Sequence, residues 1–190
     1  NPELVYRFYN ERRRQLLAGE VQPNLAHEAL ALLESTPKVN SVVVTQNVDN
    51  LHERAGTSNL LHMHGALTWV KCVNSEVRQE WPDDLTSDHR CTCCNPQHAM
   101  RPDIVWFGEI PYYMDKIQEH LFEADIFVSI GTSGNVYSAA GFADFASQSG
   151  AYTIELNLEP SKGASFFDES HCGLASELVP RFVERISTFN

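Results

Sequence analysis

The stretch ADIFVSIGTSG, residues 124–134, decides the fold class. It begins as a short apolar run of the kind found in strands covered on both faces, as in parallel sheets. The run ends in a turn of small residues, Gly131–Gly134, and residues 136–148 then show helical spacing. A strand, a turn and a helix in this order form the repeating unit of an α/β fold.

Two further segments follow the same design. Residues 40–50, NSVVVTQNVDN, carry an unbroken valine run before a polar turn, and residues 152–160, YTIELNLEP, form a strand stopped by proline. Helices are predicted over 3–18, 24–34 and 175–187. We therefore expect an α/β, Rossmann-like, doubly wound parallel sheet, with ligands at the carboxyl ends of its strands.

Residues 66–101 differ from this pattern, because they carry cysteines, are rich in Asp and Thr, and lack helical periodicity. We interpret them as a small zinc-binding module inserted into a core made of residues 1–65 and 102–190. The helical segment 3–34 is part of that core.

Four of the five cysteines lie within this module, between residues 72 and 94. Cys91 and Cys94 form a CxxC pair, and Cys72 precedes them by 18 intervening residues, but Ser75 stands where a second CxxC pair needs its partner. Cys72, Cys91 and Cys94 are the predicted ligands of a structural Zn²⁺, with Cys93 or a water as the fourth. The alternative is a degenerate knuckle with free thiols.

The composition narrows the classes of function. The 190 residues carry a net charge of −11, which repels nucleic acid and anionic lipid, and no apolar run approaches the roughly 20 residues that cross a bilayer. Clustered cysteines without a disulfide framework favour a reducing compartment. We expect a cytoplasmic protein with no nucleic acid or membrane partner; the sequence does not give its oligomeric state, although a monomer is slightly favoured.

The polar turn Gln46–Asn50 has two interpretations. Its amide and carboxylate groups can bind the hydroxyls of a sugar, or they can simply cap the following helix near Leu51. The small-residue turn after 125–130 and the pair Asn157 and Glu159 could bind ribose or phosphate, although no GxGxxG fingerprint is present. Together these loops describe a crevice of dinucleotide size.

The stretch LLHMHG, residues 60–65, offers two histidines on one face. His62 and His64 could bind a metal ion with Asp49 or His52. Alternatively, one imidazole beside the polar turn could act as a base, since histidine titrates near pH 6.5, and Gly65 would leave room for substrate.

Taken together and in order, seven segments resemble the sirtuin family, in particular its bacterial class III (CobB-like) branch. They are FYNERR (8–13), TQNVDNLHERAG (45–56), HMHG (62–65), the cysteine-bearing insert, RPDIVWFGE (101–109), IGTSGNVYSAAG (130–141) and ELNLEP (155–160).

The resemblance implies a role for each matched position. His64 would be the catalytic base. The implied NAD-binding residues are Gln46, Asn47, Val48, Asp49, Gly131, Thr132, Ser133, Asn157, Leu158, Glu159 and Ala175. The implied substrate-binding residues are Tyr9, Arg12, Val105, Phe107, Gly108, Asn135 and Val136.

The reaction so implied is NAD-dependent removal of acyl groups from protein lysines, which yields nicotinamide, O-acyl-ADP-ribose and free lysine. In this branch Tyr9 and Arg12 would lie at the floor of the acyl pocket, where a guanidinium can bind the carboxylate of succinyl or malonyl groups. The alternative is that Arg12–Arg14 is a solvated basic run.

The family's first strand, glycine-rich loop and phosphate-binding arginine have no counterpart in this sequence, so we expect this chain by itself to bind NAD poorly. Two other functions stay open at this point: a metal-dependent hydrolase that uses His62 and His64, and a non-catalytic module that binds acylated peptides or nucleotides.

Overall fold

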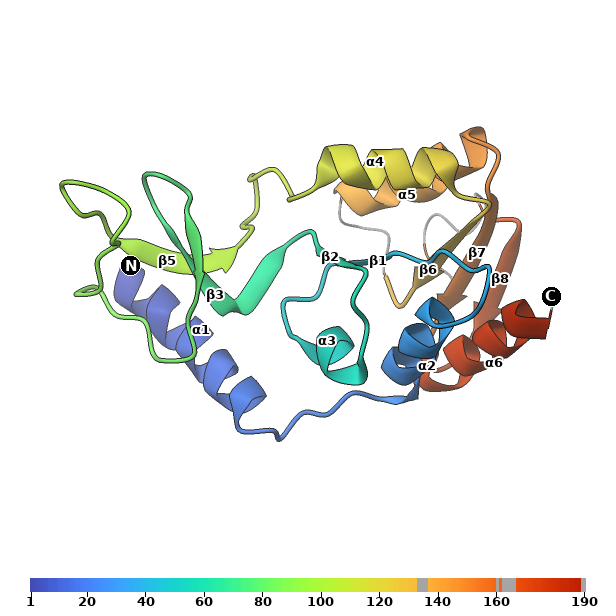
Figure 1. Ribbon diagram of the computed structural model, residues 1–190, viewed down its shortest axis with the longest axis horizontal. Helices are drawn as coiled ribbons and strands as arrows, with labels where there is room; N and C mark the ends of the chain where they lie inside the picture. Colours follow the sequence, from blue (N-terminus) through green and yellow to red (C-terminus); the bar gives the residue numbers. More distant parts are fainter. Residues whose placement is uncertain (133–136, 160, 162–166, 189–190) are drawn as a thin grey trace. The chain divides into compact units, whose positions relative to one another are not determined.

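The structure, a computed structural model, describes residues 1–132, 137–159, 161 and 167–188 (Figure 1). Contacts divide the chain into two compact units. The first unit comprises Asn1–Gln22, Val44–Arg54 and His62–Tyr112, and the second comprises Pro23–Val43, Ala55–Leu61 and Tyr113–Asn190. The predicted zinc-binding module, residues 66–101, lies within the first unit.

The first unit packs a helix against a small antiparallel sheet. Helix α1 (Pro2–Leu17) lies along strands β3 and β5 (Figure 1). The sheet has the order β4-β3-β5, with β3 at Gly65–Cys72, β4 at Arg78–Glu80 and β5 at Met100–Ile104. The short helix α3 (Leu51–Ala55) follows the polar turn, and Leu51 joins a second small core with Leu16, Leu67 and Ile104.

Polar contacts decide which face of α1 is buried. The face includes Tyr6, Asn10 and Arg13 rather than the more apolar Leu4 and Phe8, which are exposed. Asn10 donates to and accepts from the backbone of Leu85, at 2.8 and 2.9 Å, and Arg13 Nε donates to the carbonyl of Leu67 at 2.6 Å. Backbone groups that would otherwise be buried without partners are thus paired by side chains of α1.

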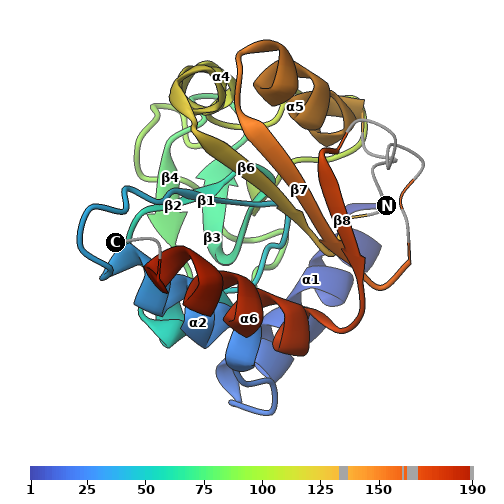
Figure 2. The same cartoon turned by 90° about the vertical axis from the view of Figure 1, so that its right-hand side faces the viewer.

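The second unit has the layered α/β architecture that the sequence predicts. Its parallel sheet has the order β6-β7-β8, formed by Ile126–Ile130, Tyr152–Asn157 and Glu169–Cys172. Helices α2 (Leu25–Glu34) and α6 (Ala175–Thr188) lie side by side on one face of this sheet, and α4 (Met114–Glu123) and α5 (Tyr137–Gln148) lie on the other (Figure 2).

The core of this second unit is formed by α2, β7 and α6. Ile154 and Leu156 alternate with Thr153 and Glu155 along β7, and all four are buried, as expected for a central parallel strand. Val179 and Phe182 of α6 complete this core with Ala29 and Leu33 of α2. The predicted α/β fold with a parallel sheet is confirmed.

Strands β1 (Val43–Thr45) and β2 (Leu60–His62) form a separate two-stranded sheet. The chain leaves β1 into the polar turn and leaves β2 into the second histidine, so the ends of both strands contribute to the candidate site. In the described part of the chain, no helix combines the length and the apolar character needed to cross a membrane.

Candidate active site and thiol cluster

The two histidines of LLHMHG lie beside the polar turn, as the base hypothesis requires. The backbone N–H of Met63 donates to the carbonyl of Thr45 at 3.1 Å, which places the turn after β1 next to the chain after β2. From there, His64 Nδ1 lies 3.2 Å from the carbonyl oxygen of Gln46, and His62 Nδ1 lies 3.3 Å from that of Asn47. Successive carbonyls of the turn are thus bound by alternate residues of one extended segment.

The contact of His64 determines its tautomer. Because a carbonyl oxygen can only accept a hydrogen bond, Nδ1 carries the proton and Nε2 carries the lone pair. Among the described residues, none hydrogen bonds to Nε2 of this half-buried side chain. His64 is therefore arranged to accept a proton at Nε2.

His62 has a different environment, since its Nε2 lies 2.8 Å from Glu53 Oε1 of α3. Burial lowers the pKa of His62, but the hydrogen bond and the charge of Glu53 outweigh burial and raise it above its usual value. Within the described residues, only the four clustered cysteines form a group suited to a metal ion, so His62, His64 and Asp49 do not make one.

In the polar turn, one side chain caps helix α3 and another is exposed. Asp49 Oδ1 accepts from the backbone N–H of Leu51 at 3.0 Å, so this side chain caps the start of α3, as the alternative interpretation proposed. Asn47 is exposed, and its side-chain amide has no partner among the described residues. Val48 packs against the small core that contains Leu51.

Gly65 ends this segment because β5 approaches it closely. Its φ is +82°, and a Cβ atom there would lie 1.8 Å from the carbonyl oxygen of Asp103. The glycine is thus required by the packing of β3 on β5.

The loop that follows β5 is bound through its backbone to the segment that carries the two histidines. Val105 N–H donates to the carbonyl of His64 at 3.0 Å, and Tyr112 N–H donates to that of Met63 at 2.9 Å. Between these two anchors the Phe107 side chain is fully exposed, and Gly108 has a φ of +91°.

A carboxylate braces the same loop. Glu109 accepts from the backbone N–H of Trp106 and from the Arg101 guanidinium, both at 2.9 Å, and the hydrogen bond from Arg101 lowers the pKa of Glu109.

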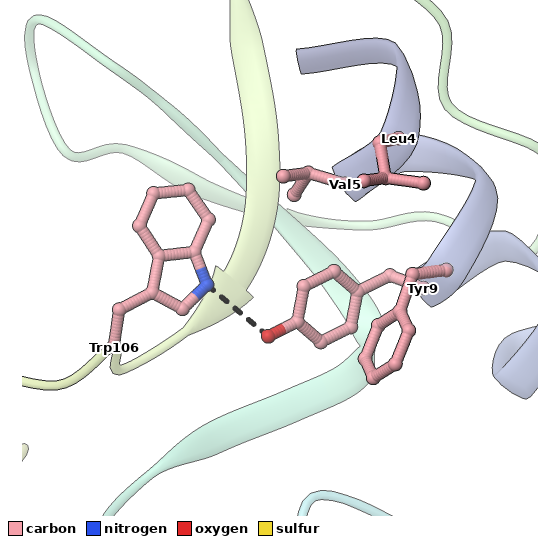
Figure 3. Close-up of a pocket in the computed structure, with 5 residues that line it drawn as sticks. Leu4, Val5, Tyr9 and Trp106 are labelled. Carbon is pink, nitrogen blue, oxygen red and sulfur yellow. Dashed lines mark hydrogen bonds between the residues drawn. The ribbon is translucent and has the colours of Figure 1, made fainter. Parts of the chain in front are cut away.

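An apolar cavity of about 390 Å³ lies between α1 and this loop. Its lining residues are Leu4, Val5, Phe8, Tyr9 and Trp106 (Figure 3). Trp106 Nε1 donates to the Tyr9 hydroxyl at 3.2 Å, and the Arg12 guanidinium lies 3.5 Å from the centre of the Phe8 ring. Tyr9 and Arg12 thus both contact Phe8, which lines the cavity.

The predicted cofactor residues outside the polar turn lie in the second unit. Asn157 Nδ2 donates to the carbonyl of Thr132 at 2.7 Å, and Gly131 N–H donates to that of Leu156 at 2.9 Å, so the ends of β6 and β7 are joined. Leu158 and Glu159 are exposed beyond β7, and Ala175 is the first residue of α6. Ser133, Asn135 and Val136 lie outside the described residues.

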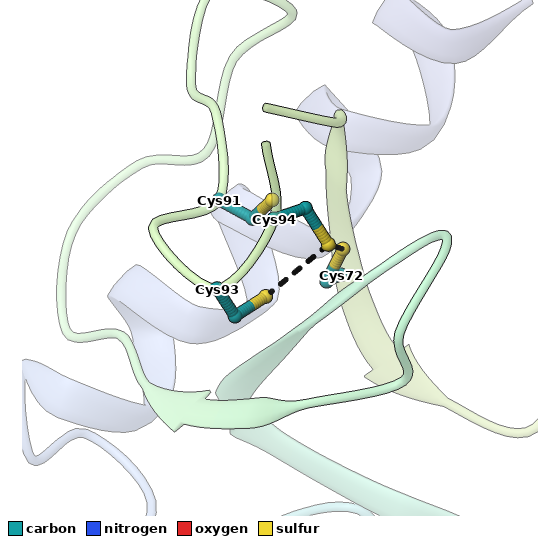
Figure 4. A group of neighbouring side chains, drawn as sticks. All are labelled: Cys72, Cys91, Cys93 and Cys94. Carbon is teal, nitrogen blue, oxygen red and sulfur yellow. Dashed lines mark hydrogen bonds between the residues drawn. The ribbon is translucent and has the colours of Figure 1, made fainter. Parts of the chain in front are cut away.

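The cysteines form a compact thiol cluster in the first unit (Figure 4). The sulfur atoms of Cys72, Cys91, Cys93 and Cys94 all lie within 4.8 Å of one another. Cys72 Sγ and Cys93 Sγ each lie 3.8 Å from Cys94 Sγ, and thiolates about 2.3 Å from a tetrahedral zinc ion would be about 3.8 Å apart. The donor set and its spacing therefore fit Zn²⁺.

Cys93 is the member of the cluster that the sequence left undecided. Its Sγ lies 3.0 Å from the hydroxyl of Ser75, the position at which the second CxxC pair is broken. A hydrogen bond from the same Ser75 hydroxyl is the main reason why the pKa of Cys72 falls to about 6. The spacing between CxxC pairs could not reveal Cys93, because it lies inside one pair rather than at its ends.

Known proteins of one family are similar to this chain over most of its length. The model of the Sir2 family matches residues 1–138. The chain belongs to the Sir2 family. It is 57% identical over 183 residues to an NAD-dependent protein deacylase of Pasteurella multocida, which covers 96% of this chain and 78% of that relative. Deacylases of the same name from Yersinia pestis and Escherichia coli K12 are 55% and 52% identical, over 99% and 98% of this chain and 68% and 67% of theirs.

Solved structures of Sir2 proteins have the same fold. A Sir2 homolog–NAD complex superposes with a TM-score of 0.88 at 32% identity, covering the whole of this chain and 73% of its own. Sir2Tm bound to a propionylated peptide has a TM-score of 0.82 at 29% identity, covering 97% of this chain and 78% of its own.

Proposed function

We propose that this protein is an NAD-dependent protein-lysine deacylase in which His64 is the catalytic base. The observation that carries the proposal is the imidazole of His64, whose Nδ1 is bound by the Gln46 carbonyl and whose Nε2 is left to accept a proton. The names of the relatives support the same activity, since those described above are NAD-dependent protein deacylases.

NAD supplies the electrophilic ribose carbon from which nicotinamide departs. The chain's own residues would bind the sugar and move its proton: the amide of the exposed Asn47 would pair with a sugar hydroxyl, and His64 Nε2 would take the proton from a ribose hydroxyl. Removal of that proton makes the oxygen a nucleophile, a step for which a positioned base is usually worth about 10²–10⁴ in rate.

The remaining proposed NAD residues belong to two places. Gln46, Val48 and Asp49 surround Asn47 in the turn, and Gly131, Thr132, Ser133, Asn157, Leu158, Glu159 and Ala175 serve the adenosine half. Gly131 suits a close approach, because its φ is +60° and no atom of the described residues lies within 4 Å of a Cβ built there. The Asn157–Thr132 bond holds the second group of loops in one arrangement.

Peptide substrates bind along the loop after β5. We assign Val105, Phe107 and Gly108 to this surface, because backbone pairing in an extended conformation is a general way to hold a peptide. For Asn135 and Val136 the substrate-binding role stays a prediction from the sequence. The backbone hydrogen bonds from Val105 to His64 and from Tyr112 to Met63 support this assignment, because they join the loop to the segment that carries the proposed base.

The acyl groups that this site accepts include succinyl and malonyl, which carry a carboxylate, as well as acetyl. The apolar cavity accepts the methylene part of a succinyl or malonyl group, while Arg12, with the Tyr9 hydroxyl, binds its carboxylate. The contact of Arg12 with Phe8 keeps the guanidinium at the edge of this cavity. Acetyl-lysine uses the cavity without the ionic contact.

The thiol cluster holds a structural zinc ion through Cys72, Cys91, Cys94 and Cys93. Zinc takes no part in the chemistry, since all four positions of a tetrahedral site are then filled by protein.

The domain division is a separate part of the proposal. Residues 66–101 form the zinc-binding module, and residues 1–65 with 102–190 form the NAD-binding core. None of the five cysteines forms a disulfide bond, which suits a reducing compartment, and we place the protein in the cytoplasm.

The experiment that tests this function follows the products. The full-length protein is incubated with NAD and with acetyl- or succinyl-lysine peptides, and nicotinamide and O-acyl-ADP-ribose are measured by chromatography and mass spectrometry. His64→Asn should reduce both products about 10²–10⁴-fold, while the peptide still binds.

Three outcomes separate this function from its alternatives. Acyl-lysine cleavage that needs no NAD and stops with a chelator would instead indicate a metal-dependent hydrolase. Peptide binding without any turnover would indicate a non-catalytic module. Full activity of His64→Asn would reject the assignment of the base.

A further inference from the structure

The pair His62–Glu53 is not used in the mechanism above, yet it contacts the turn that binds the sugar. His62 lies in the first unit at the end of β2, with a side chain that is 14% exposed. One ring nitrogen lies 2.8 Å from Glu53 of α3, and the other lies 3.3 Å from the Asn47 carbonyl. The ring therefore connects the helix after the turn to the middle of the turn.

Both partners of His62 are acceptors. A carbonyl oxygen accepts only, and an ionised carboxylate accepts only, so both ring nitrogens must carry protons to make the two contacts. A neutral imidazole has one N–H and would lose one of them. The arrangement thus requires the charged form of His62.

We propose that His62, as an imidazolium held by Glu53, is a positioning residue that fixes the Asn47 peptide and thereby the orientation of the Asn47 amide toward NAD. The proposal rests on the assignment of the turn Gln46–Asn50 to NAD under the proposed function. It makes His62 a determinant of NAD affinity, whereas His64 determines the rate of the chemical step.

The charges around the ring favour the same state. Burial lowers the pKa of His62, but Glu53 on α3 and the more distant Asp49 in the turn raise it, and the net change is upward. Desolvation raises the pKa of Glu53, but its hydrogen bond with His62 and, to a smaller extent, the charges of His62 and of His52 on α3 outweigh this and lower that pKa. Because the pKa of His62 is raised, the two-contact state is complete below that pKa and is lost as the pH rises through it.

The test uses substitutions that preserve size. Glu53→Gln removes the charge that holds the imidazolium, and His62→Gln removes the imidazolium itself. Glu76→Gln is the matched control, since Glu76 forms an ion pair with Lys71 in the β3–β4 hairpin of the same unit.

Two readouts are recorded for the full-length protein. Steady-state kinetics give kcat and the KM for NAD between pH 6 and 9, and NMR titration of the His62 ring gives its pKa without any NAD present. We expect the KM for NAD to rise about three- to tenfold in both variants at pH 6.5, with kcat changed less than about threefold. The pKa of His62 should fall in Glu53→Gln and not in Glu76→Gln.

The pH profile distinguishes positioning from a general loss of structure. The difference in KM between wild type and variants should shrink at alkaline pH, where wild-type His62 also loses its second proton. The double variant should match either single variant, because the two residues act as a unit.

The outcomes are separable. An unchanged KM for NAD in Glu53→Gln, or an unshifted His62 titration, would overturn the positioning role while leaving the deacylase assignment intact. If the wild-type protein released no nicotinamide from NAD at all, the proposed function would fail first, and the role of His62 with it. If His62→Gln did not fold, the exposed Glu53→Gln substitution would still decide the question.

Discussion

Three consecutive arginines of α1 have three different environments. Arg13 is almost fully buried and donates to backbone carbonyls of the zinc-binding module, and burial lowers its pKa. Arg14 lies at the surface, 3.6 Å from Asp84. Arg12 is exposed and lies on the Phe8 ring, so it is the arginine of the three that remains available to a ligand.

Arg12→Met should therefore separate two substrates. The substitution removes the guanidinium but keeps an apolar stem on Phe8, so we expect kcat/KM for succinyl-lysine peptides to fall at least about 100-fold, with deacetylation changed less than about threefold. Rates with both peptides measure the ratio. Arg14→Met is the control, and equal losses with both acyl groups in Arg12→Met would exclude the carboxylate-binding role.

Gly65 allows a sharper test of packing at a single position. Gly65→Ala places a methyl group against the Asp103 carbonyl in a left-handed conformation, so we expect a loss of unfolding free energy of about 3 kcal/mol or more. Urea denaturation measures it. Gly141→Ala in α5, where an added Cβ meets no atom within 4 Å, should change stability by no more than about 1 kcal/mol. Similar losses in both variants would contradict the packing explanation.

The thiol cluster is assembled from two loops. Cys72 ends β3, and the other three cysteines lie in the chain that leads to β5, so the cluster connects two strands that already pair. Cys93 Sγ lies 3.0 Å from the Ser75 hydroxyl, so the fourth thiol lies beside the position at which the second CxxC pair lacks its cysteine.

This arrangement predicts that a cysteine at position 75 can replace Cys93. Cys93→Ser should lower the zinc content and the melting temperature, and adding Ser75→Cys to it should restore both, because the second variant rebuilds four thiolates at the same place. Zinc per chain is measured by mass spectrometry, with Cys172→Ser as the control. A full zinc content in Cys93→Ser would assign the fourth position to another ligand.

At the scale of elements, the sequence predicted those whose signals are local. Asn24 forms a capping box with His27 at the start of α2, and β6 and β7 are apolar runs of the expected length. Helix α4 was not predicted, because it begins at Tyr113 in a left-handed conformation with no side-chain cap. Strand β8, ESHC, is polar and mostly exposed, so pairing with β7 rather than its own residues makes it a strand.

At the scale of the molecule, each unit contains its own hydrophobic core, and only the first contains the thiol cluster. Cys72, Cys91 and Cys94 are packed in the same core as Val70 and Met100. A metal ion that holds these thiols therefore supports the core of the first unit directly, whereas the core around Ile154 and Val179 has no such dependence.

Removal of zinc should accordingly act on one unit. Hydrogen exchange after treatment with a strong chelator should show lost protection in β3 and β5, while the amides of β6 and β7 keep theirs. Measurement by mass spectrometry at peptide resolution suffices. Equal loss of protection across both sheets would show that the two units unfold together.

The parts of the candidate site that could be predicted are those in which the interacting residues lie in one short segment of the sequence. The turn before His64 and the order of the motifs could be read from the chain, but the bond between Asn157 and Thr132 joins residues 25 positions apart and has no local signature. The same holds for the buried face of α1, since hydrogen bonds to Leu67 and Leu85 select it against the more apolar residues.

One backbone contact has a wider consequence. The Val105 N–H donates a hydrogen bond to the carbonyl of His64, so one backbone hydrogen bond joins the proposed peptide-binding loop to the proposed catalytic base. We expect a peptide substrate that binds in the correct extended conformation to stabilise the position of His64 through this hydrogen bond. A peptide that binds in another conformation would displace His64. Selectivity for the acylated peptide and the turnover rate would then be coupled.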